Sequence, residues 1–398
     1  MDQVSVGGTV HVAAGTYVEQ VDIGKQITLD GDGAGGTSIK APAALATKFT
    51  TSSANKPVVY VHGATGVTIS DLTVDGDGAG NANYRIEGIA FYNAGGTVSD
   101  ASIIRVRETP LNGNQHGVAL YANNTDSTPR TLAVTNNTIS DYQKNGMALN
   151  GDGLTATVSG NIVTGAGAIS DLAQNGIQIG YGAGGSITGN TISGNDCIVN
   201  PDCTADPTSA SNADGAAGIL LYLPGTSTVT VDGNTLTGNQ FGIWTVGATD
   251  VSITGNGVAG GASSNGIAIW DCDQWCSAGD AVGTCCMISG NDISGHAYGV
   301  LQRDFDAGAP VPAVAVHNNS ITGAATYGAW SNVALNATDN WWGSANGPAH
   351  ATNRFNVGAQ GAAVSDNVTI VPWLDAAPPA GVSYAPVTTT SQNGKYTT

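Results

Sequence analysis

The sequence has few charged side chains and very few basic ones. Only 11% of its 398 residues are charged, against about 25% in an average soluble protein. Lys and Arg number 12 against 30 Asp and Glu, the formal net charge is −18, and no run of basic residues occurs. Because phosphate backbones and anionic lipids are bound by clustered cations, this composition argues against nucleic acid or an anionic membrane surface as the partner.

The sequence also lacks long apolar stretches. No run of about 18 apolar residues occurs, so no membrane insertion is expected. Hydrophobic residues still make up 41% of the chain, which excludes disorder. Glycine is the abundant residue, with 57 copies, about twice the usual share of about 7%. This argues against an ordinary helical enzyme.

The six cysteines stand in two clusters, Cys197 with Cys203, and Cys272, Cys276, Cys285 and Cys286. Such clusters suit an oxidising compartment and predict a secreted or cell-surface protein. Because adjacent cysteines rarely pair, we expect Cys272 and Cys276 to bond to Cys285 and Cys286 in either order. Cys197 would then pair with Cys203. A zinc site of four thiolates in the second cluster is the alternative.

Two internal repeats run along the chain. In the first, a glycine precedes an apolar, any, apolar triplet; it occurs at Gly88, Gly117, Gly146, Gly176, Gly218, Gly242, Gly266, Gly299 and Gly328. In the second, an asparagine follows a short alternating segment; it occurs at Asn137, Asn161, Asn190, Asn234, Asn256, Asn291, Asn319 and Asn340. In both repeats the longest step spans residues 196–216 and the next longest spans 271–286, which indicates loop insertions there.

Short alternating strands with this period, ended by Gly, Asn or Asp, predict the coils of a parallel β-helix. About a dozen rungs would stack about 4.8 Å apart. Stacked Ile, Val and Leu would fill the interior, and the asparagines would hydrogen-bond along the axis. A leucine-rich repeat is the rival fold, but no Leu-x-x-Leu-x-Leu series recurs.

The repeats show no boundary in their middle, so we predict one β-helix domain over residues 1–375. The rhythm is lost over residues 34–60, where we expect the N-terminal cap or short helix that hides a solenoid's end strand. Residues 376–398 are rich in Pro, Ala, Thr and Gly and are expected to form a linker or tail.

Two segments resemble a known class of proteins. Residues 9–19 (TVHVAAGTYVE) and 25–33 (KQITLDGDG) resemble the opening rung of pectin esterases and their relatives. Residues 339–348 (DNWWGSANGP), followed by VSDNV and PWL, resemble a closing NWWG module of bacterial surface β-helix proteins. The chain as a whole resembles the right-handed parallel β-helix proteins of the pectate-lyase-like class. The resemblance implies an all-β, single-stranded, right-handed parallel β-helix (solenoid).

That class contains hydrolases, lyases, esterases, epimerases and inactive proteins, so fold alone does not choose a reaction. The chain has no Asp-Pro-His of mannuronan epimerases and no Gly-His-Gly of polygalacturonases; Gly295-His296-Ala297 is the nearest segment. Lys144, His116 and Tyr142 are polar candidates for proton transfer near the glycine-led strands.

Aromatic residues recur at alternate positions of the glycine-led strands, which point outward. Repeated rings on one outer face predict a groove that stacks on sugar rings. Alternatively, the rings pack under the two long loops and shield the sheet. The candidate substrate-binding residues are Tyr92, Tyr121, Tyr222, Trp244 and Trp270, with Arg303, whose guanidinium matches a uronate carboxylate or else neutralises an adjacent acid.

Acids follow two neighbouring strands, at Asp271 and Asp273 and at Asp304 and Asp306. Asp271 and Asp304 would stack about 4.8 Å apart. At that distance one carboxyl keeps a proton and serves as the acid while another serves as the base or nucleophile. Asp271, Asp304 and Asp306 are therefore the candidate catalytic residues. The four acids could instead bind Ca²⁺, which several lyases of this class use, or be solvated turn residues.

Together these features predict a secreted or cell-surface monomer that binds a polysaccharide along an aromatic outer face. Whether it also cleaves the polymer, as a polysaccharide lyase or a glycoside hydrolase, stays open at this stage, as does the identity of the polymer. The alternative is a non-catalytic adhesion or structural module, which the closing NWWG segment and the trailing linker favour.

Overall fold

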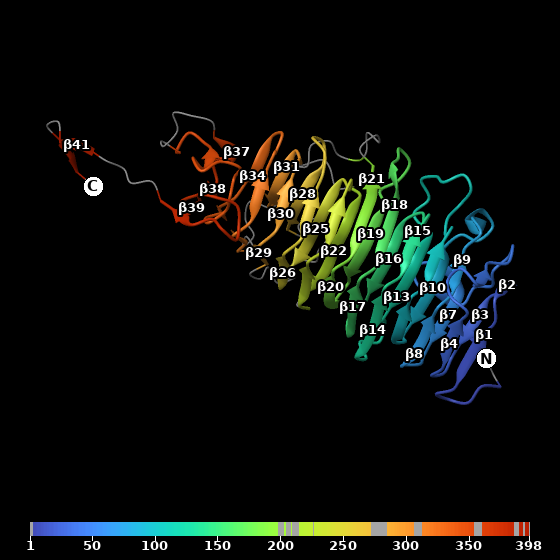
Figure 1. Ribbon diagram of the computed structural model, residues 1–398. Coiled ribbons are helices and arrows are strands. Elements are labelled where there is room, and N and C mark those ends of the chain that lie inside the picture. The colour runs from blue at the N-terminus through green and yellow to red at the C-terminus, as the bar shows by residue number, and fades with distance from the viewer. Residues whose placement is uncertain are drawn as a thin grey trace.

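The computed structural model describes residues 3–197, 203, 208, 215–225, 227–271, 285–305, 313–353, 360–385, 390–392 and 395–397. These residues form an elongated rod whose strands run across its long axis (Figure 1). In the described part of the chain, the helical structure consists of one 3-10 turn, η1 (Ala79–Asn81). No helix there is long and apolar enough to span a membrane.

Three long sheets form the sides of the rod. The 13-stranded sheet consists of β1 (Thr9–Val12), β4 (Thr28–Gly31), β8 (Val67–Ser70), β11 (Gly96–Ser99), β14 (Arg130–Thr135), β17 (Leu154–Ser159), β20 (Gly184–Thr188), β23 (Val229–Asp232), β26 (Val251–Thr254), β29 (Cys286–Ser289), β32 (Ala315–His317), β35 (Leu335–Asn336) and β38 (Val368–Thr369).

The 12-stranded sheet consists of β3 (Val21–Ile23), β7 (Ala54–His62), β10 (Ile86–Tyr92), β13 (Val118–Asn123), β16 (Asn145–Asn150), β19 (Asn175–Gly180), β22 (Ala217–Gly225), β25 (Phe241–Ala248), β28 (Asn265–Trp270), β31 (Tyr298–Arg303) and β34 (Tyr327–Ser331), with β6 (Phe49–Thr50) beside β7. The 11-stranded sheet consists of β2 (Gly15–Val18), β5 (Thr37–Lys40), β9 (Thr73–Asp75), β12 (Ser102–Ile104), β15 (Thr138–Ser140), β18 (Ile162–Ala168), β21 (Thr191–Asp196), β24 (Thr235–Thr237), β27 (Gly257–Ala259), β30 (Asp292–Ser294) and β33 (Ser320–Thr322).

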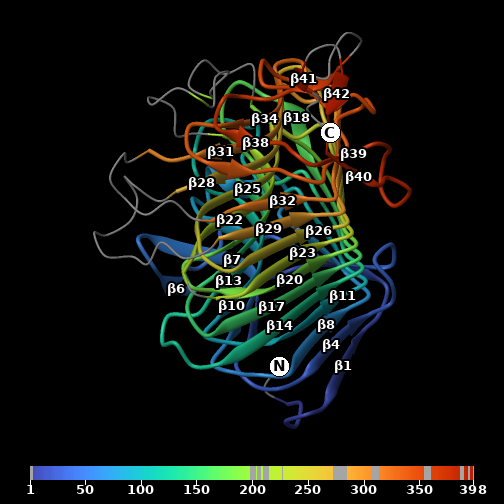
Figure 2. The ribbon, with the colours of Figure 1, turned by 90° about the vertical axis from the view of Figure 1, so that its left-hand side faces the viewer.

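Every neighbouring pair in these sheets is parallel, except β6 with β7. Each coil contributes one strand to each sheet, and successive coils stack along the axis (Figure 2). The prediction of a parallel β-helix with about a dozen rungs is confirmed. Short pairs complete the chain: β36 (Pro348–Ala349) with β37 (Gly361–Ala363), β39 (Trp373–Leu374) with β40 (Ser383–Tyr384), and β41 (Thr390–Gln392) with β42 (Lys395–Thr397).

The interior of the rod is built from columns of apolar side chains. One column on the 12-stranded sheet is fully buried and consists of Ile89, Leu120, Met147, Ile177, Ile219, Ile243, Ile267, Val300 and Ala329. A glycine precedes most of these residues because coils approach closely there. A Cβ on Gly146 would lie 2.6 Å from the carbonyl oxygen of Gly176 in the next coil. The glycine repeat therefore marks a backbone contact between coils.

One coil departs from the predicted alignment. Ala90 pairs with Tyr121 and Ile89 with Leu120, so Gly88 is aligned with Ala119 rather than with Gly117. The motif at Gly117 is thus two residues out of register with its neighbours. A shift of two residues preserves the inward and outward faces of a strand, so the side-chain alternation survives.

The predicted asparagine ladder is confirmed in full. Each Nδ2 donates to the Oδ1 of the asparagine in the next coil, at 2.9 Å throughout. The eight members are Asn137, Asn161, Asn190, Asn234, Asn256, Asn291, Asn319 and Asn340, and all are nearly inaccessible to solvent. They occupy the corner between the 13-stranded and 11-stranded sheets.

Residues 34–60 do not form the predicted N-terminal cap. The first coil is β1 to β3, and β5 and β7 belong to the next coil of the stack. The sequence repeat is interrupted because residues 41–55 leave the coil. The β6–β7 hairpin in this segment packs on the outer face of the 12-stranded sheet. Phe49 of β6 stacks on Tyr60 of that face at 5.5 Å between ring centroids.

The cysteine pairing follows the sequence prediction at one of two places. Cys197 and Cys203 form a disulfide. Cys285 is bonded to Cys286, so the expected bonds to Cys272 and Cys276 are wrong, as is a four-thiolate zinc site. Cys272 and Cys276 lie outside the described residues.

Candidate functional site

The predicted aromatic residues do lie on one face, the outer face of the 12-stranded sheet. Tyr92, Tyr222 and Trp270 occupy the same column of the register. Trp244 occupies the adjacent outward column, as its position after Gly242 predicts. Tyr121 lies in that same column, and not in that of Tyr92, because of the two-residue shift at Gly117. The stacking geometry on which the predicted groove depends is therefore present.

Two of these rings are not available to a sugar. Trp244 is 5% exposed and Trp270 is 2% exposed. Trp244 stacks on Phe241 at 4.8 Å and meets Trp270 edge to face at 4.7 Å. They form the centre of an apolar cluster on the outer face, with Leu220. These two rings are therefore buried in this cluster, where packed aromatics stabilise one another by excluding water. Most of the two long loops lies outside the described residues.

Asp271 and Asp304 lie on neighbouring rungs, as the register predicts. The Asp271 N–H donates to the Arg303 carbonyl oxygen at 3.1 Å. The Asp271 Oδ2 accepts the N–H of Phe305 at 3.0 Å, so this carboxylate holds the backbone of the next rung. Arg303 is buried and its guanidinium lies 3.9 Å from the Phe305 ring centroid. The Arg303 guanidinium thus packs against the rings of Trp270 and Phe305, and its predicted role in binding a uronate stays a prediction.

Only two of the four predicted calcium ligands lie in the part of the chain that the structure describes. Asp273 and Asp306 lie outside the described residues, and the calcium and catalytic roles assigned to them stay predictions. Asp271 and Asp304 alone supply two carboxylates, fewer than the six to eight oxygen ligands of Ca²⁺. Elsewhere in the described chain, no group of three or more His, Cys, Asp or Glu side chains converges to hold a metal ion. No chemical step is therefore assigned to calcium.

A polar cavity of about 420 Å³ opens on the same outer face, nearer the N-terminus. Its floor is formed by β10, β13, β16 and β19, and one wall is the turn between β6 and β7. Its lining includes Thr51, Ser52, Asn55, Arg85, Glu87, His116, Tyr121, Lys144, Asn145, Asn150, Gln178 and Tyr181. Of the residues the sequence singled out, it gathers Tyr121, Lys144 and His116. This cavity is the candidate site.

Glu87 is the acid of the cavity. It is 3% exposed, and its Oε2 has no hydrogen-bond partner among the residues that the structure describes. Burial raises the pKa of Glu87 well above its usual range, and the nearby charge of Arg85 only partly offsets this. A carboxyl in this environment holds a proton at pH values where exposed carboxyls are ionised, which suits a general acid or base.

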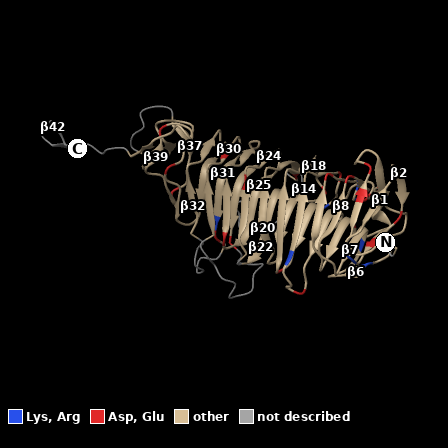
Figure 3. Ribbon diagram, turned by 60° about the horizontal axis from the view of Figure 1, so that its bottom comes forward, with Lys and Arg blue, Asp and Glu red and all other residues tan. Residues whose placement is uncertain are grey.

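Two cations line the cavity beside Glu87. The Arg85 guanidinium donates to Thr51 Oγ1 at 3.0 Å and to Ser52 Oγ at 2.8 Å, so neutral hydroxyls hold it. Lys144 Nζ donates to the Ala173 carbonyl oxygen at 2.6 Å. Charged residues are sparse along the strands (Figure 3). Two cations facing one cavity are therefore a local exception in an acidic protein, and they favour an anionic ligand.

Backbone strain occurs at two residues that line the cavity. Arg85 has φ 59° and Tyr181 has φ 54°, in the left-handed region. For a residue other than glycine, this conformation costs about 1–3 kcal/mol. It is found where surrounding contacts impose it, often at functional sites. The Arg85 side chain is held by Thr51 and Ser52 on the hairpin, and its backbone N–H donates to His116 Nδ1.

The remaining lining supplies phenol and amide groups. Burial raises the pKa of Tyr121 above its ordinary value, so its hydroxyl stays a proton donor. Asn145 Nδ2 donates to Gln178 Oε1 at 3.2 Å, and Gln178 Nε2 donates to Asn150 Oδ1 at 3.0 Å. This row of amides on two neighbouring coils can donate to and accept from sugar hydroxyls.

Glu87 was missed by the sequence reasoning, which followed positions after each motif glycine. Glu87 stands directly before Gly88, and the register places Asn145, Asn175 and Asn265 in the same column. From Glu87 to Asn265, every other residue of this column is an asparagine or is apolar. The sequence signal for the site was therefore an acid at the position directly before a motif glycine. Glu87 is also the one Asp or Glu among the cavity-lining residues that the structure describes. The cavity therefore lacks the carboxylate pair that glycoside hydrolysis needs.

Comparison with known proteins supports the fold. The sequence profile of the family described as "Right handed beta helix region" matches residues 132–282. The A-module of the mannuronan C-5 epimerase AlgE4 from Azotobacter vinelandii superposes with a TM-score of 0.57 at 16% identity, over 92% of this chain and 91% of that one. The Dettilon tailspike protein gives 0.51 at 13% identity, over 82% and 61%. No curated protein matches the chain by sequence. The chain has the right-handed parallel β-helix fold.

Proposed function

We propose that the protein is a secreted or cell-surface enzyme that acts on a uronate-containing polysaccharide at the Glu87 cavity. The observation that carries this proposal is the buried Glu87 carboxyl, with an Oε2 that lacks a hydrogen-bond partner, facing a cavity that also holds Arg85 and Lys144. A uronate offers what this set recognises, a carboxylate for the cations and hydroxyls for the amides.

The reaction best suited to these groups is proton transfer at the carbon next to the uronate carboxylate. Arg85 and Lys144 neutralise the charge that develops on the carboxylate when this proton leaves. Glu87, once ionised, takes the proton as the base. The Tyr121 phenol donates a proton, either to the glycosidic oxygen in an elimination or to the carbon in an epimerisation. Paired-carboxylate hydrolysis is disfavoured because the described lining holds one acid.

The structural similarity guides the choice of substrate. The AlgE4 A-module is named as a mannuronan epimerase, so mannuronan is the first polymer to test. The disulfide between Cys197 and Cys203 supports an oxidising location.

The direct test is to incubate the protein with mannuronan, polygalacturonate and a neutral glucan. Absorbance of unsaturated products reports elimination, reducing ends report hydrolysis, proton NMR reports epimerisation, and calorimetry reports binding. We expect turnover of a polyuronate, and its loss in Glu87→Gln but not in the exposed control Glu19→Gln. Turnover that survives Glu87→Gln would overturn the site, and binding without any turnover would favour the non-catalytic adhesion module.

A further inference from the structure

A buried histidine–glutamate pair lies in the loop between β12 and β13, and its histidine, His116, is part of the cavity lining. His116 Nε2 lies 2.9 Å from Glu108 Oε1, and the two side chains are 1% and 6% exposed. Neither group reacts in the chemistry proposed above. Burying a carboxylate and an imidazole is costly unless both are fully hydrogen-bonded, so the contacts of the pair indicate what it does.

The contacts define which nitrogen of His116 carries the proton. The backbone N–H of Arg85 points at His116 Nδ1, at 3.2 Å. An N–H can only donate, so Nδ1 must present its lone pair. Nε2 faces a carboxylate oxygen and therefore carries the ring proton. The geometry assigns a neutral imidazole that donates to Glu108 and accepts from Arg85.

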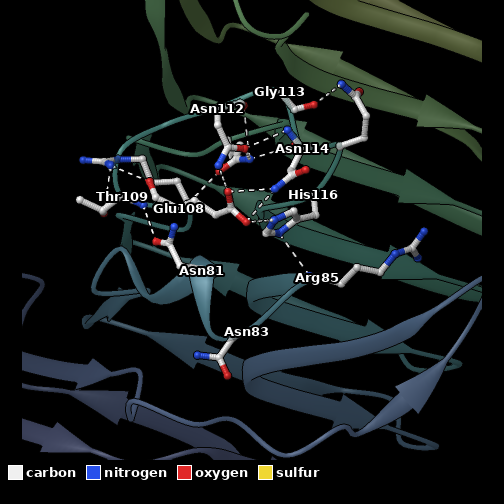
Figure 4. A network of polar contacts seen from close by, with 12 residues as sticks. Asn81, Asn83, Arg85, Glu108, Thr109, Asn112, Gly113, Asn114 and His116 are labelled. Carbon is white, nitrogen blue, oxygen red and sulfur yellow. Dashed lines mark hydrogen bonds and ion pairs between the residues drawn. The ribbon is translucent and has the colours of Figure 1, made fainter.

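Glu108 is fixed by amide groups of its own loop (Figure 4). Asn114 Nδ2 lies 3.0 Å from both carboxylate oxygens, and Asn112 Nδ2 also donates to the carboxylate. The Glu108 N–H donates to Gln143 Oε1 at 2.7 Å. Such a set of donors holds the carboxylate in one orientation, and the carboxylate in turn orients the imidazole.

The network reaches both cations of the cavity. Arg85 is the residue with φ 59°, and its strained backbone donates to His116 Nδ1. Lys144 follows Gln143, and the Lys144 N–H donates to the Gly117 carbonyl oxygen, next to His116, at 2.9 Å. The loop between β12 and β13 thus fixes the backbone from which each cationic side chain starts.

We propose that Glu108 and His116 are a positioning pair that holds Arg85 in its left-handed conformation and so aims its guanidinium into the cavity. The effect on ligand selection rests on the proposed function, whereas the effect on Arg85 does not. The pair acts only through Arg85 and touches no reacting atom. A misplacement of about 1 Å in a binding group can cost a large factor in function.

The tautomer is tested on the full chain labelled with ¹⁵N-histidine. Long-range ¹H–¹⁵N spectra show which ring nitrogen of His116 is protonated. We expect a neutral ring with the proton on Nε2. A proton on Nδ1, or on both nitrogens at neutral pH, would mean that the Arg85 N–H has no acceptor there and would overturn the proposal.

The positioning role is tested with two variants of His116. The amide oxygen of His116→Asn can replace Nδ1 as acceptor, whereas His116→Leu removes it. We expect faster hydrogen exchange of the Arg85 amide in His116→Leu than in His116→Asn. We also expect oligomannuronate binding to fall about 10-fold or more in His116→Leu and no more than about threefold in His116→Asn. Equal effects of the two variants would show that His116 contributes only packing and not a hydrogen bond to Arg85, which would overturn the positioning role.

The matched control is His11→Leu, which removes another histidine paired with a carboxylate, at 3.0 Å from Asp30, on the surface. It should leave Arg85 exchange and ligand binding unchanged. If the wild-type protein binds no oligomannuronate, the proposed function fails, but the tautomer and the Arg85 exchange rates still decide the positioning role.

Discussion

The side-chain amide of Asn234 donates to the Oδ1 of Asn256 at 2.9 Å, and the same oxygen accepts the Asn234 backbone N–H at 2.9 Å. Asn234 Nδ2 also donates to the Ile187 carbonyl oxygen at 2.8 Å. One buried oxygen therefore satisfies two donors of the preceding coil. The asparagine column stabilises the corner because every buried polar group in it is paired.

Asn256→Ala should destabilise the protein strongly. It removes the acceptor of the buried Asn234 backbone N–H and one of the acceptors of the Asn234 side-chain amide. A buried donor without an acceptor costs about 1–3 kcal/mol. We expect a loss of about 2–5 kcal/mol in the free energy of unfolding, measured by urea denaturation. The exposed Asn336→Ala should change stability by no more than about 0.5 kcal/mol. Similar losses in both variants would show that the ladder adds nothing beyond helix-corner packing.

Glu87 should make stability depend on pH. Burial raises the pKa of folded Glu87 above that of the unfolded chain. As pH rises above about 4.3, the unfolded carboxyl loses its proton while the folded one keeps it, so stability falls, by at most about 1.4 kcal/mol per pH unit, until the folded carboxyl also ionises. Glu87→Gln should remove this loss. Denaturation of the two proteins from pH 3 to 8 should give curves that diverge as pH rises. Parallel curves would contradict the burial of an isolated carboxyl.

Lys144→Met and Arg85→Met should each weaken oligomannuronate binding about 10-fold or more, since a hydrogen bond to a charged group contributes about 1.5–3 kcal/mol. Binding of a neutral glucan oligomer should change far less. Raising the salt concentration should weaken wild-type binding and reduce the difference between wild type and variants. Calorimetry measures all three effects. Lys40→Met, which removes a lysine paired with Asp77 at 3.0 Å, is the control; an equal loss there would show that only net charge matters.

Asp271→Asn and Asp304→Asn should leave turnover at the cavity intact. Glu87 lies on β10 and Asp271 directly follows β28, and these strands are six steps apart in the 12-stranded sheet, or about 29 Å at the strand spacing of about 4.8 Å. An asparagine at position 271 keeps an oxygen that can accept the Phe305 N–H. We expect both variants to fold. Product formation from mannuronan is the measurement. Loss of turnover in these two, with Glu87→Gln active, would move the catalytic site to the acid pair.

The sequence predicts the coil and its columns because each depends on a local repeat. The asparagine positions alone give all eight members of the ladder, and glycine marks the close approach seen at Gly146. Asp271 and Asp304 fall on adjacent rungs because they follow the motif glycine at the same distance. The two-residue shift at Gly117 escapes this reasoning, since a shift by an even number leaves the faces of the strand unchanged.

The cavity could not be read from the repeat. It is made where two irregular segments, the hairpin carrying Thr51 and the loop carrying His116, return to the outer face of the sheet. Their hydrogen bonds to Arg85 join residues 34 and 31 positions apart. Likewise, an outward position does not reveal whether a ring is covered, and Trp270 is buried although it points away from the core.

Because the coils pair in parallel and those from Asn137 to Asn340 share the same corner amide, such a coil is an interchangeable unit. Gene duplication or deletion of one whole turn would lengthen or shorten the rod without rewriting its neighbours. The distance between the Glu87 cavity and the far end of the molecule can therefore evolve in whole-coil increments while the residues that line the cavity stay unchanged.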